Sequence, residues 1–302
     1  MKPPSVCAII INWNGKIDTS ECLFSLEKVS TKYASLSIAV VDNHSTDGSL
    51  HELEKRFPKV VFIRNKENAG FAGGNNTGMR YAKDQHVDYI WLLNNDTVVD
   101  IKVLSAVTSF YNPSVGAVGS KIYFSKGYEF HTDWYEKKDL GHVLWYAGGC
   151  IDWQNMFSSH RGVDEVDRGQ YEKEMITEYV TGCSFFIRTD LLNRIGYFDE
   201  SYFMYMEDVD YSLRIQRAGY TTVYNPTSVL WHKNASSTGG SGSSLHEYYQ
   251  TRNRLKIGMT YAPPRTKFAL IREGIRILGG GSTVKKRAVI DYISGRMGQY
   301  HE

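Results

Sequence analysis

Short apolar runs alternate with amphipathic segments along the first hundred residues. A continuous apolar run is typical of a strand buried on both faces, and apolar residues three and four positions apart are typical of a helix. The alternation predicts a Rossmann-like α/β fold, with a mostly parallel central sheet flanked by helices and right-handed crossovers. The expected strands are residues 6–11, 37–43, 60–65 and 89–94, and the expected helices between them pass through 23–29, 50–57 and 79–81.

The pattern changes after residue 100. A helix over 101–111 and a strand over 116–124 continue the alternation, whereas residues 125–178 are rich in Gly, His, Trp and acidic residues and have poor periodicity. We expect a loop-rich insertion there, with short antiparallel strands that include residues 144–153. Three further strands are expected at 179–188, 221–226 and 228–233, followed by a helix over 246–262 and a helical tail.

Polar residues stand at the carboxyl ends of the four expected parallel strands. In open α/β sheets the ligand binds in the crevice at this edge. Asn and Asp also favour loops and helix caps, which explains one or two such endings more easily than four. The residues are Asn12, Asp42, Asn65 and the run Asn94, Asn95 and Asp96.

A glycine-rich segment, residues 70–76, precedes the third expected helix. Such a segment lets backbone N–H groups approach an anion at a helix N-terminus, although glycines also simply make turns. The segment matches neither GxGxxG nor a phosphate-binding Walker loop. This weighs against a Rossmann dehydrogenase and a P-loop nucleotide hydrolase.

Acidic and aromatic residues crowd together in residues 199–211, before a helical pattern that ends at Gly219. Aromatic walls exclude water and raise the pKa of a carboxyl group, which suits Glu207 or Asp208 to proton transfer. The alternative is an acidic first turn that complements the helix dipole. We expect Asp210 to cap the helix.

Composition narrows the class of protein further. The 302 residues are 42% hydrophobic and 23% charged with a net charge of +2, as in an ordinary globular protein. The four cysteines show no CxxC spacing, so buried free thiols are expected, with Cys150 and Cys183 serving packing. The N-terminus has no long apolar segment and no stretch is long enough to span a bilayer, which predicts a cytoplasmic protein.

Two late segments carry separate hypotheses. Residues 234–244 are small and polar, which favours a loop that closes over a ligand, with a plain linker as the alternative. The tail over 261–302 combines helical apolar spacing with basic clusters. Such a tail is expected either to contact an anionic membrane surface at the inner face of the cell membrane or to pack on the domain with its basic face in water.

Several motifs together resemble the inverting family 2 glycosyltransferases of GT-A fold, and within them the bacterial rhamnosyltransferase-like branch. The resemblance covers about residues 5–258 in order, and implies a GT-A domain over 1–260, with a nucleotide-sugar half (1–124) and an acceptor and catalytic half (125–260). The motifs are VCAIIINWNG, VVDNHSTDGS, NAGFAGGNNTG, LLNNDT, TGCSFFIR, GYFDESYFMYMEDVDYSLR and WHK.

The resemblance also implies a role for individual residues. Asn12, Asn14 and Asp42 correspond to positions that hold the nucleotide, and Gly73 and Asn75 to the loop beside the nucleotide sugar. Asn94, Asn95 and Asp96 stand where the family carries a DxD motif, so that only Asp96 remains a strong ligand for Mg²⁺ or Mn²⁺. Asp208 corresponds to the catalytic base with Glu207 as its rival, His232 completes the metal or diphosphate site, and Arg252 is expected to assist there.

The implied activity is transfer of a single sugar, because the QxxRW motif of processive synthases is absent. The expected donor is dTDP-rhamnose or another dTDP- or UDP-sugar, and the acceptor a glycan or lipid-linked glycan in bacterial cell-wall or surface polysaccharide synthesis, with no nucleic acid partner. A nucleotidyltransferase would carry a glycine-rich signature with Arg and Lys close to the first strand, and residues 12–20 lack that signature. A non-catalytic carbohydrate- or nucleotide-binding homologue is the remaining alternative.

Overall fold

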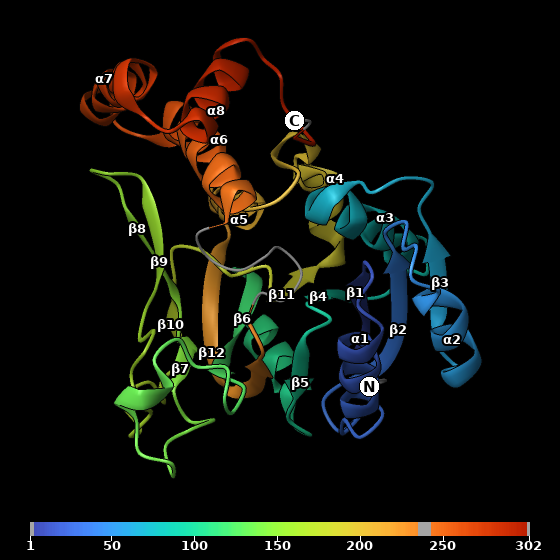
Figure 1. The fold of residues 1–302 in the computed structure, drawn as a ribbon. Coiled ribbons are helices and arrows are strands. Elements are labelled where there is room, and N and C mark those ends of the chain that lie inside the picture. The colour runs from blue at the N-terminus through green and yellow to red at the C-terminus, as the bar shows by residue number, and fades with distance from the viewer. Residues whose placement is uncertain (1–2, 235–242, 301–302) are drawn as a thin grey trace.

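A twisted ten-stranded sheet forms the centre of the fold, beside a separate two-stranded hairpin (Figure 1). The computed structural model describes residues 3–234 and 243–300. Neighbouring strands follow the order β10-β12-β6-β11-β4-β1-β2-β3, with β5 added beside β12 and β7 beside β6. The strands are β1 (Ser5–Asn12), β2 (Ser35–Asp42), β3 (Val61–Arg64), β4 (Tyr89–Leu93), β5 (Thr97–Val99), β6 (Val115–Phe124), β7 (Leu144–Tyr146), β8 (Gly149–Asp152), β9 (Phe157–His160), β10 (Met175–Ile176), β11 (Ser184–Arg188) and β12 (Thr221–His232).

The parallel part of the sheet confirms the predicted alternation. Strands β4, β1, β2 and β3 pair in parallel, and their apolar runs alternate between two cores. Val6, Ala8 and Ile10 face the helices α1, α2 and η1, whereas Cys7 and Ile9 face α3. The helices are α1 (Lys16–Leu26), α2 (Ser49–Arg56), α3 (Gly70–Asp84), η1 (Val103–Tyr111), η2 (Thr132–Trp134), η3 (Thr189–Leu191), α4 (Leu192–Ile195), η4 (Glu200–Tyr202), α5 (Glu207–Arg217), α6 (Ser244–Tyr261), α7 (Pro264–Gly280) and α8 (Thr283–Ile293).

The second half of the sheet departs from the prediction at two strands. The expected strand over 179–188 is shorter, because β11 begins only at Ser184. Residues 221–232 form one long strand, β12, rather than two short ones, because a register shift between Asn225 and Val229 accommodates Pro226 inside it. β12 pairs in parallel with β6, and β11 runs antiparallel between β6 and β4. The insertion contains the expected short antiparallel strands, among them the separate hairpin β8–β9.

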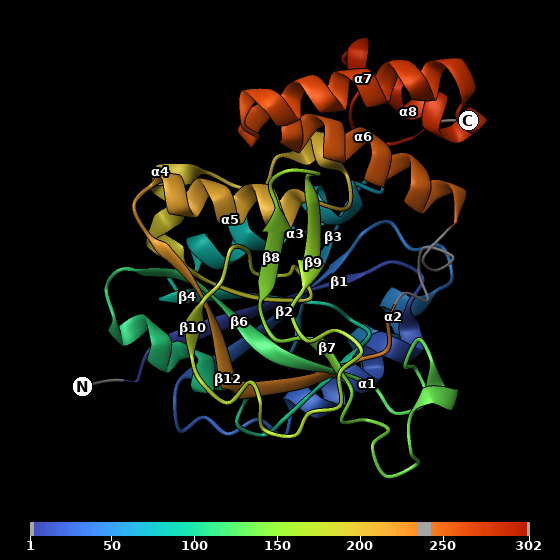
Figure 2. The same cartoon turned by 90° about the vertical axis from the view of Figure 1, so that its left-hand side faces the viewer.

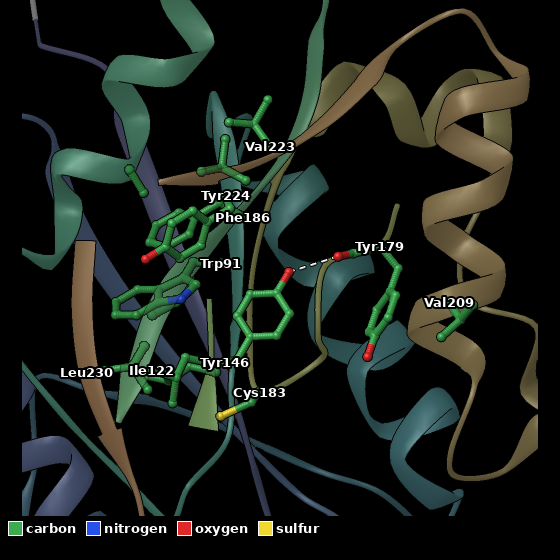
Figure 3. Close-up of a cluster of buried hydrophobic side chains, with 14 of the residues drawn as sticks. Trp91, Ile122, Tyr146, Tyr179, Cys183, Phe186, Val209, Val223, Tyr224 and Leu230 are labelled. Atoms are coloured by element: carbon green, nitrogen blue, oxygen red, sulfur yellow. Dashed lines mark hydrogen bonds between the residues drawn. The ribbon is translucent and has the colours of Figure 1, made fainter. Parts of the chain in front are cut away.

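The core over the second half is largely aromatic (Figure 3). Trp91 and Phe186 stack at 4.7 Å between ring centroids, and the Tyr146 hydroxyl donates to the Tyr179 carbonyl at 2.8 Å. Cys7, Cys22 and Cys183 are buried free thiols, as predicted. The prediction for Cys150 is wrong: it lies on the outward face of the β8–β9 hairpin, where side chains alternate, and is exposed.

Helices α6, α7 and α8 form a layer at one end of the molecule, above α5 (Figure 2). The expected helix over 246–262 is α6, and the tail adds two more. In the described ranges 3–234 and 243–300 no helix is long and apolar enough to cross a membrane. The proposed closing loop over 234–244 falls mostly on residues outside the described ranges. The division into a domain over 1–260 and a tail stays a prediction.

Candidate active site

The ends of β1 and β2 form a buried polar network. Asn12 and Asp42 lie opposite each other in register and are 0% and 2% exposed. Asn12 Nδ2 donates to Asp42 Oδ1 at 3.0 Å and to the hydroxyls of Ser45 and Ser49, while Asn12 Oδ1 accepts from Thr19 at 2.8 Å. The prediction brought these two residues together correctly. Their burial gives them the task of shaping the loop after β2, and their contact with a nucleotide stays a prediction.

More accessible residues surround this network. Asn14 is exposed and left-handed (φ 51°), and its Oδ1 accepts from Thr46 N at 2.8 Å. Trp13 beside it is 41% exposed. Asn94 and Asn95 are half-buried, and Asn95 donates to Thr19 at 3.0 Å. These residues line the same sheet edge, so this edge keeps a surface that a flat ring and a ribose can contact.

The glycine-rich segment has a packing role that the sequence did not reveal. Residues 70–76 form the first turns of α3 and not a loop. A Cβ on Gly73 would come within 2.7 Å of Ala69 Cβ, and Asn75 is 1% exposed and donates to the Phe71 carbonyl at 2.9 Å. Gly73 and Asn75 thus lie against protein. Their predicted contact with a nucleotide sugar gains no support from this placement.

Asp96 and His232 meet although they are far apart in sequence. Asp96 lies in the turn between β4 and β5, and β5 pairs antiparallel with the end of β12, placing Thr97 opposite His232. His232 Nε2 lies 3.1 Å from Asp96 Oδ1, and both side chains are buried. Neither ring nitrogen of His232 makes a well-aligned hydrogen bond within the described residues, so the contact is mainly electrostatic.

Electrostatics at this pair favour a cation. Burial opposes protonation of His232, but the Asp96 carboxylate and Cys183 beside it raise its pKa well above the ordinary value. Behind it, burial lowers the pKa of His160 to about 4, and Trp145 packs edge-on to both rings. An oxygen of Asp96 and a nitrogen of His232 therefore lie where a divalent ion could replace the proton. Within the described residues no cluster of three or more His, Cys, Asp or Glu forms a metal site by itself.

Backbone strain precedes the acidic pair. Phe203, Tyr205 and Met206 all have left-handed backbones, with φ of 64°, 66° and 71°. Such conformations cost non-glycine residues energy and persist only where the surroundings hold them. Met206 is the residue just before α5, at the N-cap position, and no side chain caps the helix there. The strained turn therefore changes the direction of the chain just before α5 and sets the direction of the first turn of α5, which carries Glu207 and Asp208.

The two carboxyl groups have different surroundings. Glu207 is 4% exposed and its Oε2 has no hydrogen-bond partner in the described residues; burial, and then the charge of Asp208, raise its pKa well above the usual range. Asp208 is half-buried and accepts from the backbone N–H groups of Gly182 and Val209, each at 2.8 Å. Burial raises the pKa of Asp208, and these N–H groups lower it again. The backbone N–H groups therefore favour the ionised form at Asp208, whereas burial favours the protonated form at Glu207.

The prediction that Asp210 caps the helix is wrong. The helix begins at Glu207, so Asp210 lies inside it. Its Oδ2 accepts from Arg214 Nε at 2.8 Å and its Oδ1 accepts from the Tyr261 hydroxyl at 2.7 Å. Asp210 thus joins α5 to the end of α6.

The Gly182–Cys183 segment, just before β11, links the acidic pair of Glu207 and Asp208 to the Asp96–His232 pair. Gly182 N donates to Asp208, and the next residue, Cys183, lies beside His232, within electrostatic reach of Asp96 and Asp208. A Cβ on Gly182 would come within 2.9 Å of the Phe71 ring, so only glycine allows this close approach. The sequence reasoning treated this segment as an ordinary strand. Its signal was a glycine beside a buried cysteine in the motif TGCSFFIR.

Arg252 lies elsewhere than predicted. Its guanidinium is fully buried and donates to the carbonyl oxygens of Ser201, Tyr202 and Gly298 at 2.7–3.1 Å. The neighbouring Asn253, also fully buried, donates from Nδ2 to three carbonyls of the strained turn. These donors are occupied by protein, so the placement gives Arg252 no support as a diphosphate ligand. Arg252 and Asn253 instead hold residues 201–205.

The α1–α2 surface has a separate cavity. Its volume is about 300 Å³, and its lining includes Lys16, Phe24 and Arg56. None of the predicted site residues lines it, so we place the candidate site at the strand ends.

Comparison with known proteins identifies the relatives of the chain and says nothing of single site residues. The family described as "Glycosyltransferase like family 2" matches residues 3–256. An N-acetylglucosaminyl-diphospho-decaprenol L-rhamnosyltransferase of Mycobacterium tuberculosis is 26% identical over 236 residues, which cover 69% of this chain and 70% of the relative.

Two solved structures share the fold. The mannosyltransferase PcManGT from Pyrobaculum calidifontis, in complex with GDP-Man and Mn²⁺, superposes with a TM-score of 0.57 at 17% identity, over 98% of this chain and 80% of that one. GalNAc-T7 with UDP, GalNAc and Mn²⁺ gives a TM-score of 0.66 at 17% identity, over 96% of this chain and 55% of that one.

Proposed function

Because the chain belongs to glycosyltransferase family 2, with a GT-A-like fold, we propose that it transfers one rhamnose unit from a dTDP donor to a lipid-linked glycan, with inversion at the anomeric carbon. The family implies a nucleotide-sugar donor and a glycan acceptor. The choice of rhamnose, of a polyprenol-linked acceptor and of surface polysaccharide synthesis is supported by the mycobacterial relative and by the sequence motifs.

One observation carries the proposal. The Gly182–Cys183 segment holds Asp208 on one side and the Asp96–His232 pair on the other, so a carboxylate base and a cation site share one short stretch of chain. Both groups therefore contact neighbouring residues of the same stretch of chain, which supports a reaction there between a donor diphosphate and an acceptor hydroxyl.

Asp208 is assigned as the base. An acceptor hydroxyl must lose its proton as it attacks, and a positioned carboxylate accelerates such a step by about 10²–10⁴-fold. Asp208 is half-buried and its ionised form is favoured by the backbone N–H groups, so it reaches the acceptor in the charged form. Glu207 is buried and stays protonated, so Asp208 has no second carboxylate charge beside it. The hydroxyl oxygen bonds to the anomeric carbon, the bond to the diphosphate breaks, and the proton goes to Asp208.

The leaving diphosphate gains negative charge during this step. Asp96 and His232 fit a divalent ion, because the ring nitrogens lack well-aligned hydrogen bonds and an acidic oxygen lies 3.1 Å away. Two protein ligands suffice where substrate phosphates and water supply the others. When bound, Mg²⁺ or Mn²⁺ would neutralise the departing diphosphate.

Asp208→Asn tests the proposal. We expect the variant to lose about 10²–10⁴-fold in kcat for dTDP-rhamnose while still melting at a higher temperature when dTDP and Mn²⁺ are added. UDP and GDP, each with and without the ion, complete the panel, and Asp190→Asn on the exposed side of η3 is the matched control. Normal turnover by Asp208→Asn would remove the base assignment. A thermal shift selective for UDP or GDP would refute the dTDP donor.

A further inference from the structure

Helix α7 carries two apolar faces, and protein covers only one of them. Thr266, Leu270 and Gly274 form the covered face, where Leu270 packs on Gly258 of α6 and Gly274 faces Val289 of α8. The second face is the α7 stripe, with exposed fractions from 38% to 65%. Its residues are Phe268, Ile271, Ile275 and Leu278. The spacing of three, four and three places them along one line of the helix.

Arginines flank the α7 stripe. Arg265, Arg272 and Arg276 are exposed and share one line of the helix, about a quarter turn from the stripe. The structure records no ion pair for these three within the described residues. Residues 261–300 contain eight Lys and Arg but only two acidic residues, a net charge of +6, whereas the whole chain carries +2. The positive charge of the protein is therefore concentrated at this end.

We propose that α7 lies flat on an anionic membrane surface, with the α7 stripe in the headgroup region and the arginines on the lipid phosphates. An amphipathic helix of this kind binds through buried apolar area and through attraction to anionic lipids. Packing on the domain with a basic face in water accounts for the arginines but leaves four large apolar side chains in water. An antiparallel two-fold pairing with a second copy would bring the arginine lines of both copies together, which like-charge repulsion opposes.

Helix α6 connects α7 to the candidate site. Helix α6 holds the strained turn before Asp208 through Asn253, and α7 follows directly after α6 (Figures 1 and 2). In this step alone the inference rests on the proposed function: an acceptor on a polyprenol lies in the membrane, and α7 would bring the base to it. Membrane binding itself needs no activity and is measured separately.

The test is flotation of the full chain with vesicles of phosphatidylcholine, with or without about one third phosphatidylglycerol. We expect binding to the anionic vesicles, weakened at high salt, and little binding to phosphatidylcholine alone. Phe268→Ser with Ile275→Ser should lower the partition coefficient at least about tenfold. Arg265→Gln with Arg272→Gln and Arg276→Gln should lower it about a hundredfold, since each basic residue near the surface contributes about fivefold.

Matched variants separate the surface from general effects. Ile101→Ser with Ile176→Ser removes side chains that are 54% and 67% exposed on other elements, and Lys59→Gln with Lys66→Gln and Lys102→Gln removes the same charge from exposed sites. These controls should bind like the parent chain, and all variants should keep its melting temperature. Equal binding by the α7 variants and their controls would overturn the proposal. So would a dimer in sedimentation that dissociates when the α7 stripe is changed.

Discussion

Replacing Asn253 by Ala removes the side chain that holds the strained turn before the acidic pair. Asn253 Nδ2 lies 3.0, 2.8 and 2.9 Å from the carbonyl oxygens of Tyr202, Met204 and Tyr205. The amide has two N–H groups, so three acceptors share two hydrogen bonds. Asn253 is fully buried, and water does not readily take its place.

The magnitude follows from these contacts. A neutral hydrogen bond contributes about 0.5–1.5 kcal/mol net, and a buried carbonyl left without a donor costs about 1–3 kcal/mol. Two lost bonds and at least one stranded carbonyl therefore lower the free energy of unfolding by about 2–6 kcal/mol. Urea unfolding measures this loss directly.

The effect on activity is expected to exceed a simple loss of stability. Phe203, Tyr205 and Met206 each hold a left-handed backbone that costs about 1–3 kcal/mol, so the released turn relaxes. Asp208 lies two residues after Met206, so it is expected to move with the turn. A displacement of about 1 Å at a reacting group costs on the order of 10²-fold in rate. We expect kcat to fall by about 10–100-fold while KM for the donor stays close to that of the parent chain.

Thr251→Ala is the control, because Thr251 is half-buried on the same helix. Wild-type stability together with wild-type kcat in Asn253→Ala would refute the reasoning. A loss of stability with unchanged kcat below the melting temperature would show that the turn does not position Asp208.

Three further perturbations test other parts of the site. Glu207→Gln should stabilise the chain at pH 8. Above the ordinary pKa of about 4.3 the unfolded parent chain loses the Glu207 proton, whereas the folded chain keeps it because burial raises the pKa of Glu207. The stability of the parent chain therefore falls as the pH rises above this value, and the glutamine variant avoids that loss. In urea unfolding from pH 5 to 8, the variant's gain in unfolding free energy over the parent chain should become smaller towards pH 5. A gain that is the same at every pH would contradict this reasoning. Gly70→Ala places a Cβ 2.4 Å from the Phe203 carbonyl oxygen at a φ of +70°. Its loss of stability should exceed the loss of about 1–2 kcal/mol expected for Gly127→Ala, which also has a positive φ but whose added Cβ meets no atom within 4 Å. Equal losses in thermal unfolding would argue against the contact with Phe203. Asp96→Asn should raise the Mn²⁺ concentration for half-maximal turnover at least about tenfold, whereas Asp100→Asn should not; equal metal curves would remove Asp96 from the cation site.

Local patterns predicted the parallel half of the fold. The runs that end at Asn12, Asp42 and Asp96 form neighbouring strands, because buried parallel strands are recognisable as continuous apolar segments. The pattern was misleading at β12, where Pro226 looked like a break but sits at a register shift within one strand. Whether a proline ends a strand depends on its neighbours in the sheet, and these are distant in sequence.

The site could be predicted only in part for the same reason. The acidic pair stood out by residue type and the Asp96–His232 pair was implied by the family resemblance, but the segment that joins them, Gly182–Cys183, has no unusual composition. The glycines of α3 and the side chain of Arg252 looked like ligand groups because their polarity or flexibility is visible in the sequence. Their burial against Glu200, Phe203 and the turn carbonyls is a property of tertiary packing alone.

The three-residue strand β5 has a consequence for biosynthesis. Within the described part of the chain its only sheet partner is β12, and this pairing sets Asp96 beside His232. During synthesis the ribosome releases β5 long before β12, since more than a hundred residues separate Thr97 from His232. A nascent chain can complete its parallel strands early, yet the Asp96 turn waits for β12 to emerge. If Asp96 and His232 hold the metal ion as proposed, donor chemistry would be silent until most of the polypeptide has left the exit tunnel, and ribosome-bound intermediates would not consume the cell's activated sugar.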